Sequence, residues 1–181
     1  MSTLEVNSQE LIQSVLETLA TGEAFLTQLT DADYTRRLPV AFNASIGCHY
    51  RHCLDHFRSV IGAANFGHVN YDHRERGTII ENDRFAALNG TRELLDAYEG
   101  LDRSLVTRSL NVTCRTSCST TGSQWSPSTV GRELMYSVAH AVHHYALIGF
   151  MAGVMGLKVP AGFGIAPSTL KHETAGKTVS T

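Results

Sequence analysis

The chain has 181 residues, of which 43% are hydrophobic and 18% charged, and its formal net charge is -2 at pH 7. This length suits one domain with its own hydrophobic core, so we expect residues 1–181 to form a single domain. The near-neutral charge and scattered basic residues exclude the dense positive surface that nucleic-acid binding requires, so we expect no nucleic-acid partner.

The N-terminal stretch MSTLEVNSQELIQ carries acidic residues and lacks the positive start and apolar run of an export signal. We therefore expect a cytoplasmic protein whose four cysteines are reduced thiols. Cys114 and Cys118 are four residues apart, which differs from the C-x-x-C spacing of a zinc knuckle or a redox site. We interpret both as ordinary thiols.

Two helices are predicted in the first third of the chain. Residues 8–30 have apolar side chains at helical spacing behind a possible Ser8 N-cap. A connection containing Pro39 follows, and Asn43 or Ser45 can cap a second helix that runs to about Ala64. The polar stretch HVNYDHRERG then predicts an irregular crossover.

The middle of the chain predicts a third helix and then a change of structure. This helix spans about Glu81 to Thr107, and Gly90 and Gly100 weaken it enough to divide it into two pieces. Residues 108–126 are rich in Thr, Ser and Val and contain a Thr-Gly turn, which predicts a short β-hairpin.

The last predicted helix contains the apolar run LMYSVAHAVHHYALIGFMAGVMG, residues 134–156, behind an N-cap at Ser128 or Thr129. Three histidines and several small residues would be costly in lipid, so a buried helix fits this run better than a membrane span. After Gly156 two prolines and three glycines predict an irregular C-terminal arm, frayed from about residue 170.

Four long helices with one extended crossover predict an all-α fold, an up-and-down or crossed four-helix bundle. The hairpin or an irregular insert precedes the last helix, and the C-terminal arm follows it. We expect such a protein to be water-soluble, without a membrane partner.

The histidines of the last helix are placed to bind a metal. His140 and His144 are four residues apart, so their side chains lie on one helical face and can reach the same atom. His143 points more nearly in the opposite direction. The apolar stripe beside His140 and His144 is formed by Leu134, Val138, Ala141, Tyr145, Ile148 and Ala152.

A second group of histidines lies in SIGCHYRHCLDHFRSV on the predicted second helix, where His49, His52 and His56 form a polar ridge. Facing ridges of imidazoles in a bundle make an interior metal site, and zinc or nickel accepts nitrogen ligands. Three neutral imidazoles leave positions open for water or substrate. Asp55 could orient a ligand histidine or be a surface charge.

Two other interpretations of the histidines stay open. The ridge on the second helix can be a solvated face, and the three histidines of the last helix can form a polar seam at a dimer interface. Either would leave the protein without a metal site.

The two histidine segments resemble motifs of the DinB/YfiT-like superfamily of metal-dependent four-helix-bundle proteins. SIGCHYRH is similar to a segment whose first ligand ends the pattern Ser/Thr-Ile-Gly-x-x-x-x-His, and HAVHH is similar to the family's His-x-x-x-His on the last bundle helix. The resemblance covers nearly the whole chain, as a single DinB-like domain. It implies that the ligands of a divalent metal, zinc or nickel, are His52, His140 and His144.

The chain also departs from this family pattern. Many relatives follow the last ligand with Arg-Gly-Gln, where this chain has HYALIGF. It has additional histidines at His49, His56 and His143, which remain alternative ligands, and His49 or His56 could replace His52.

The resemblance implies two kinds of function. Relatives include transferases that act on low-molecular-weight thiols, isomerases that depend on such thiols, and an ergothioneine-pathway domain with three histidines. A metal-dependent transferase is thus implied, with a metal that binds a thiolate cofactor near a second, apolar small-molecule substrate. The alternative is a non-catalytic bundle of the stress or damage response that binds a metal or a small molecule. The family and the C-terminal arm also suggest a homodimer.

The crossover carries a candidate anion site. Tyr71, Asp72, Arg74 and Arg76 could lie over the mouth of the bundle, where the planar arginine groups would bind a carboxylate. The same mixed charges also suit a solvated loop with internal ion pairs. The arm segment FGIAPST could close the site or pack against a partner subunit.

Overall fold

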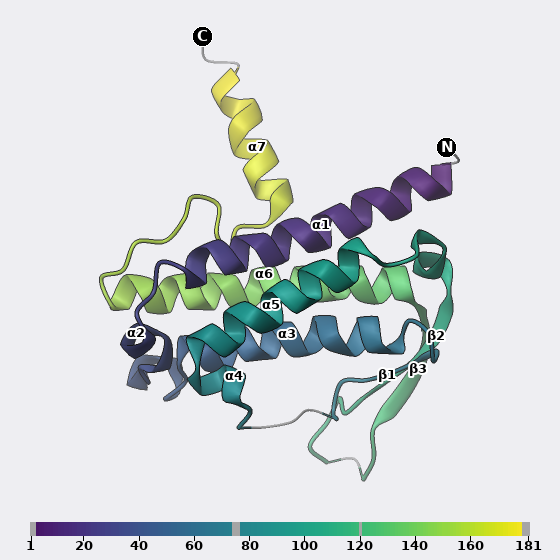
Figure 1. Ribbon diagram of the computed structural model, residues 1–181, viewed down its shortest axis with the longest axis horizontal. Helices are drawn as coiled ribbons and strands as arrows, with labels where there is room; N and C mark the ends of the chain where they lie inside the picture. The colour runs from purple at the N-terminus through teal and green to yellow at the C-terminus, as the bar shows by residue number, and fades with distance from the viewer. Residues whose placement is uncertain (1–2, 74–76, 120, 179–181) are drawn as a thin grey trace.

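Figure 1 shows the computed structural model, which describes residues 3–73, 77–119 and 121–178. The described chain is mostly helical, and a small three-stranded sheet adjoins the helices. The α-helices and 3-10 helices (η) are α1 (Thr3–Leu26), α2 (Asp31–Thr35), η1 (Pro39–Ala41), α3 (Ile46–Ala63), α4 (Ile79–Asn82), α5 (Arg84–Glu99), η2 (Arg103–Thr107), α6 (Val130–Val154) and α7 (Pro167–Thr178). The strands are β1 (His68–Asn70), β2 (Ser109–Cys114) and β3 (Gln124–Thr129).

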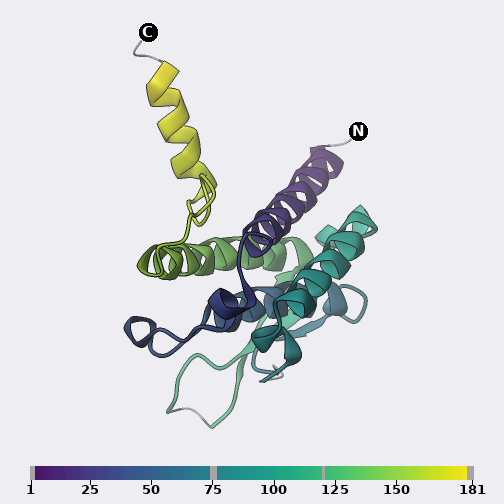
Figure 2. The same cartoon turned by 60° about the vertical axis from the view of Figure 1, so that its left-hand side comes forward.

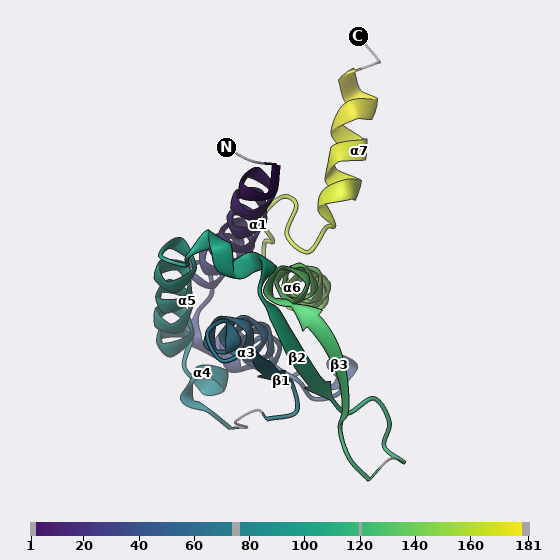
Figure 3. The ribbon, with the colours of Figure 1, turned by 90° about the vertical axis from the view of Figure 1, so that its right-hand side faces the viewer.

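Four long helices pack on one another around the hydrophobic core. Both α1 and α3 pack against α5 and α6, so each of the four contacts two others, as the end-on view of Figure 3 shows. The largest fully buried side chains include four tyrosines, among them Tyr50 and Tyr145, whose rings stack with centroids 6.2 Å apart. Burying a large apolar side chain contributes about 1.5–3 kcal/mol, so these interfaces hold the helices together.

Side-chain caps fix where α3 and α6 begin. Ser45 Oγ accepts a hydrogen bond from the backbone N–H of Cys48 (3.1 Å), and Thr129 Oγ1 accepts one from Arg132 (3.2 Å). Asn43, the other cap suggested for α3, has a left-handed backbone with φ of 60°. The residue after it, Ala44, forms an isolated β-bridge with Leu38. Ser45 and Thr129 are thus the caps among the predicted options.

The predicted bounds of the first helix were wrong at both ends. α1 begins at Thr3, so Ser8 is a buried residue within it and not its N-cap. The helix ends at Leu26 because Thr30 starts a second helix: its hydroxyl accepts from Asp33 N–H, and the Asp33 carboxylate accepts from Thr30 N–H. This reciprocal cap fixes the start of α2.

The third predicted helix is divided, but Gly90 is not the cause. Asp83 ends α4 and caps α5, and its carboxylate accepts from Phe85 and Ala86 N–H. Gly100 ends α5, as the sequence suggested. Gly90 lies inside α5, where a Cβ would approach Arg58 Nη2 to 2.3 Å, so this glycine makes room for a guanidinium.

The sheet contains the predicted hairpin and one further strand, β1, that the sequence did not predict. β2 and β3 form the predicted antiparallel hairpin, and β1 pairs with β2 in parallel, with Val69 opposite Val112. The crossover expected to be irregular therefore begins with a strand, whose central Val69 is buried. Such a short strand depends on its distant partner, and its own sequence gives a weak signal.

The apolar stripe predicted on the last helix faces the core. Leu134, Ala141, Ile148 and Ala152 are fully buried, and Tyr145 is nearly so. Within the described ranges, no helix combines the length and the hydropathy that a bilayer span needs.

The C-terminal arm is irregular only at its start. Phe163 anchors it, with its ring centroid 4.6 Å from that of Phe25 and 4.7 Å from that of Tyr145. The chain then forms α7, which projects away from the other helices in Figure 2, so the arm predicted to be irregular contains a helix. Pro167 is the first residue of α7, a position where proline favours a helix because its missing N–H is not needed there.

Gly47 brings α4 close to the first turn of α3. A Cβ at this position would lie 2.2 Å from the Glu81 carbonyl oxygen and 2.8 Å from the Tyr34 ring. The Tyr34 hydroxyl donates a hydrogen bond to the carbonyl of Ile80 (2.6 Å) on the same short helix. The glycine therefore lets Glu81 lie beside α3.

We expect Gly47→Ala to lower the free energy of unfolding by about 1–3 kcal/mol, the usual cost of overpacking. Gly62→Ala is the matched control in the same helix, because a Cβ there meets nothing within 4 Å. It should be neutral or stabilising by up to about 1 kcal/mol. Urea denaturation measures both, and equal stability of the two variants would contradict the close approach of α4.

Candidate metal centre

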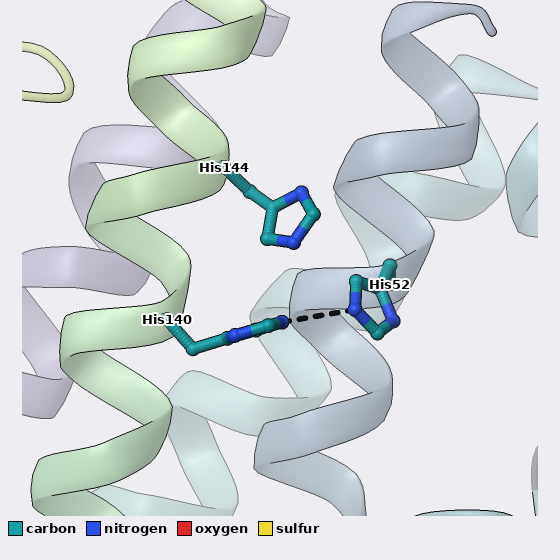
Figure 4. Close-up of side chains that lie close together, drawn as sticks. All are labelled: His52, His140 and His144. Atoms are coloured by element: carbon teal, nitrogen blue, oxygen red, sulfur yellow. Dashed lines mark hydrogen bonds between the residues drawn. The ribbon is translucent and has the colours of Figure 1, made fainter. Parts of the chain in front are cut away.

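Three histidines from two helices converge in the interior. One ring nitrogen each from His52 on α3 and from His140 and His144 on α6 lie within 4.8 Å of one another. His140 Nε2 lies 2.9 Å from His52 Nε2, and Figure 4 shows the three rings pointing toward one another. All three side chains are half-buried.

This arrangement fits a divalent metal. Zinc binds imidazole nitrogen at about 2.0–2.1 Å, so the nitrogens of a tetrahedral site lie about 3.4 Å apart. The nitrogens here range from 2.9 Å to at most 4.8 Å apart, so small side-chain movements complete the geometry. Three imidazoles are also a donor set that zinc and nickel accept, with positions left for other ligands.

His49 supports His144 from outside this group. Its Nδ1 lies 3.0 Å from His144 Nδ1, so one of these nitrogens donates a hydrogen bond to the other. Burial and, to a lesser extent, nearby His143 lower the pKa of His49, which favours its neutral form. Such a bond orients His144 and leaves its Nε2 available.

A row of neighbouring imidazoles runs through His49, His144, His52, His140 and His56, and His56 closes the end away from His49. It is buried, and its ring centroid lies 4.1 Å from that of His140 and 4.8 Å from that of His52. On its other side it stacks on Tyr71 at 4.8 Å, and Tyr136 lies edge-on at 5.6 Å. The ring of His140 is therefore held by aromatic packing.

A buried carboxylate holds Tyr71 in place. Glu133, in the first turn of α6, is 1% exposed and accepts hydrogen bonds from the Tyr71 hydroxyl (2.7 Å) and Ser128 Oγ (2.6 Å). Arg132 Nη1 lies 3.0 Å from the same carboxylate. Burial, and next the bond to Glu133, raise the pKa of Tyr71, so its hydroxyl stays a donor. Sequence reasoning missed this role, because no local spacing links the two residues.

The other end of the row opens on a cavity of about 480 Å³. Its lining residues are Cys48, His49, Arg51, His52, Gly77, Glu81 and His144. The Cys48 thiol donates to Glu81 Oε1 (3.0 Å), and Arg51 Nε lies 3.2 Å from Glu81 Oε2. A ligand in this cavity would meet a polar wall and the histidines together.

Two other residues considered for the site, His143 and Asp55, lie outside the group of three histidines. His143 is exposed on α6. Asp55 forms an ion pair with Arg51 Nη1 at 2.5 Å, so its carboxylate balances a cation beside the cavity.

The anion site proposed for the crossover is not supported at its described positions. Tyr71 is turned inward to Glu133, and Asp72 accepts hydrogen bonds from Arg115 N–H and from Ser123. These bonds tie Tyr71 to α6 and Asp72 to the hairpin. Arg74 and Arg76 lie outside the described residues.

Comparison with known proteins points to one family. Residues 1–166 match the sequence model of the DinB family. The crystal structure of the DinB-like protein YjoA from Bacillus subtilis is similar, with a TM-score of 0.61 and 15% identity over 85% of this chain and 98% of that one, a likeness in fold.

A curated sequence relative is much longer than the matched region. A segment of 104 residues is 38% identical to part of "FK506-binding protein 5" from Rhizopus delemar. The match covers 58% of this chain and 27% of that protein, so the chain spans only part of the relative's length.

We expect Tyr71→Phe to destabilise the protein by about 1–3 kcal/mol, because it removes a hydrogen-bond donor from the buried Glu133 carboxylate. A double-mutant cycle with Glu133→Gln checks the cause by chemical denaturation. The double variant should lose less stability than the sum of the single losses, with a coupling of about 0.5–3 kcal/mol. Strict additivity would show that the bond contributes nothing.

Proposed function

Because the chain belongs to the DinB family, we propose that it binds a divalent metal through His52, His140 and His144 and is a metal-dependent transferase. The observation that carries the proposal is the group of three imidazole nitrogens, within 4.8 Å of one another, beside a cavity. In this proposal the four long helices form the bundle that is the scaffold of the site.

The residues around the site would each have a defined task. A bound zinc or nickel ion would lower the pKa of a coordinated water or thiol. His49 orients His144, and His56 packs against His140. The ion pair between Arg51 and Glu81 lines the cavity and limits the ligands that fit there.

We propose a small thiol as one substrate. The cavity wall consists of imidazoles, a thiol, an ion pair and a glycine, which suits a small polar ligand better than a large apolar one. The second, apolar substrate implied by the family resemblance would therefore bind at the outer edge of this cavity. A cytoplasmic location is part of the proposal, because thiols stay reduced there.

We also propose a homodimer. The outer face of α6 exposes Met135 (62%), Phe150 (57%) and Val154 (52%), and exposed apolar surface of this kind favours association. Light scattering on the purified protein gives its mass in solution.

Hydrogen bonds between the histidines favour a second candidate function. His52 pairs with His140 and His49 pairs with His144, so these nitrogens have partners within the protein. The second candidate is a non-catalytic bundle of the stress or damage response that binds a metal or a small molecule. If it binds small molecules without metal, chelator treatment should change neither its melting temperature nor its ligand binding.

We expect His140→Ala/His144→Ala to remove stoichiometric metal from protein purified without a histidine tag. Metal content is measured by mass spectrometry. Zinc or nickel at 100 times its dissociation constant should stabilise the wild type by about 2.7 kcal/mol and leave the double variant unchanged.

His143→Ala is the matched control for this experiment, because His143 lies on the same helix but is exposed. It should keep both the metal and the stabilisation. A wild-type protein that carries no metal and melts at the same temperature with or without added zinc or nickel would contradict the enzyme proposal.

A further inference from the structure

Side chains one helical turn apart form two facing stripes. Cys48, His52 and His56 follow one another at four-residue intervals on α3, and Tyr136, His140 and His144 do so on α6. Such residues lie on one face of a helix. His56 contacts Tyr136 and His140, whereas His52 contacts His140 and His144, so the stripes run in opposite directions.

Cys48 is therefore the next residue of the α3 stripe at the open end of the site. It lies one turn beyond His52, and both line the cavity together with His144. Its thiol is half-buried, donates a hydrogen bond to Glu81 Oε1 (3.0 Å) and accepts one from Ser45 Oγ (3.3 Å). In the structure this sulfur points toward Glu81. It lies outside the group of converging ligand atoms, which consists of His52, His140 and His144.

We propose that Cys48 is the fourth ligand of the metal held by His52, His140 and His144, an inference that rests on the proposed function. Two pairs at four-residue spacing, Cys48 with His52 and His140 with His144, then face each other across antiparallel helices. One cysteine and three histidines are a donor set of four-coordinate zinc. Rotation of the Cys48 side chain between staggered rotamers moves its sulfur by about 3 Å. The proposal requires a rotamer in which the sulfur leaves Glu81 and reaches the metal.

When Cys48 binds the metal, the neighbouring Glu81 carboxylate takes up the proton that the thiol loses. The S–H bond of Cys48 breaks, its electron pair forms the bond to the metal, and the proton passes to the Glu81 carboxylate that already accepts the thiol hydrogen bond. The guanidinium of Arg51 holds the other oxygen of Glu81, so the acceptor stays beside the thiol. No oxidant or reductant takes part.

This ligand has a consequence for the chemistry of the site. The thiolate of the chain itself takes the coordination position that water or an external thiol would use, so a substrate has to displace Cys48. A thiolate also favours zinc or cobalt over magnesium and manganese, which prefer oxygen ligands.

Cobalt reconstitution tests the inference, because a thiolate bound to Co²⁺ gives a charge-transfer band in the near ultraviolet that imidazole does not give. The test uses untagged full-length protein, Co²⁺ alone and no added thiol. We expect the band in the wild type and its loss in Cys48→Ala, with the visible d–d bands retained. Zinc affinity should fall by about tenfold or more, since even groups that only orient ligands contribute about 10–100-fold.

Cys114→Ser and Cys118→Ser are the matched controls and should keep the band, because both residues lie in the hairpin region and neither lines the cavity. Cys48→Ser, which has nearly the same size, replaces Cys48→Ala should the alanine variant fold poorly. Glu81→Gln should also keep the band, since Glu81 only receives the proton.

Alkylation gives an independent readout on the wild type. Zinc should slow the reaction of Cys48 with iodoacetamide by about tenfold, as peptide mass spectrometry measures it, and should leave exposed Cys118 unaffected. Equal reactivity of Cys48 with and without bound zinc would overturn the inference.

The two proposals fail in different ways. Cobalt bound with d–d bands but without a charge-transfer band overturns the role of Cys48 and leaves the histidine site intact. A d–d spectrum that changes in Glu81→Gln but not in Cys48→Ala also overturns it, because the fourth ligand is then the carboxylate. Absence of cobalt binding in the wild type overturns the proposed function and this inference together.

Discussion

The contact between α3 and α6 is the constraint on which the rest of the structure depends. It brings imidazoles of both helices together in the interior, where a polar nitrogen without a partner is costly. The pairs His52–His140 and His49–His144 satisfy part of this requirement by hydrogen bonds. A divalent metal would satisfy it with stronger bonds, and this is the physical reason that a row of histidines favours a metal site over a plain core.

The two ends of this row differ in a way that suits a binding site. At one end His56 is buried against Tyr71, and Glu133 anchors Tyr71 with a hydrogen bond. At the other end the row opens on a cavity beside the ion pair of Arg51 and Glu81. A ligand can therefore approach from the cavity, while aromatic packing at the opposite end holds the ring of His56.

The small elements around the four long helices supply the groups that make this asymmetry. Tyr71 follows β1, and Ser128, a second donor to Glu133, lies in β3. Glu81 lies in α4, which approaches α3 because residue 47 is a glycine. The sheet and the short helix thus fix the surroundings of the histidines, whereas the long helices fix the histidines themselves.

The sequence by itself determined what depends on neighbours within one element: two candidate caps for each of α3 and α6, the apolar stripes, and the shared face of His140 and His144. It also predicted the hairpin, whose strands are adjacent in the chain. The helical wheel places His49, His52 and His56 on one ridge, and the family pattern implied His52. The tertiary structure brings His52 together with His140 and His144. The tertiary structure also decided the bonds from Cys48 to Glu81 and from Tyr71 to Glu133. It decided the pairing of β1 and the course of α7 as well. The helical period relates residues a few positions apart, whereas these contacts depend on how whole elements pack.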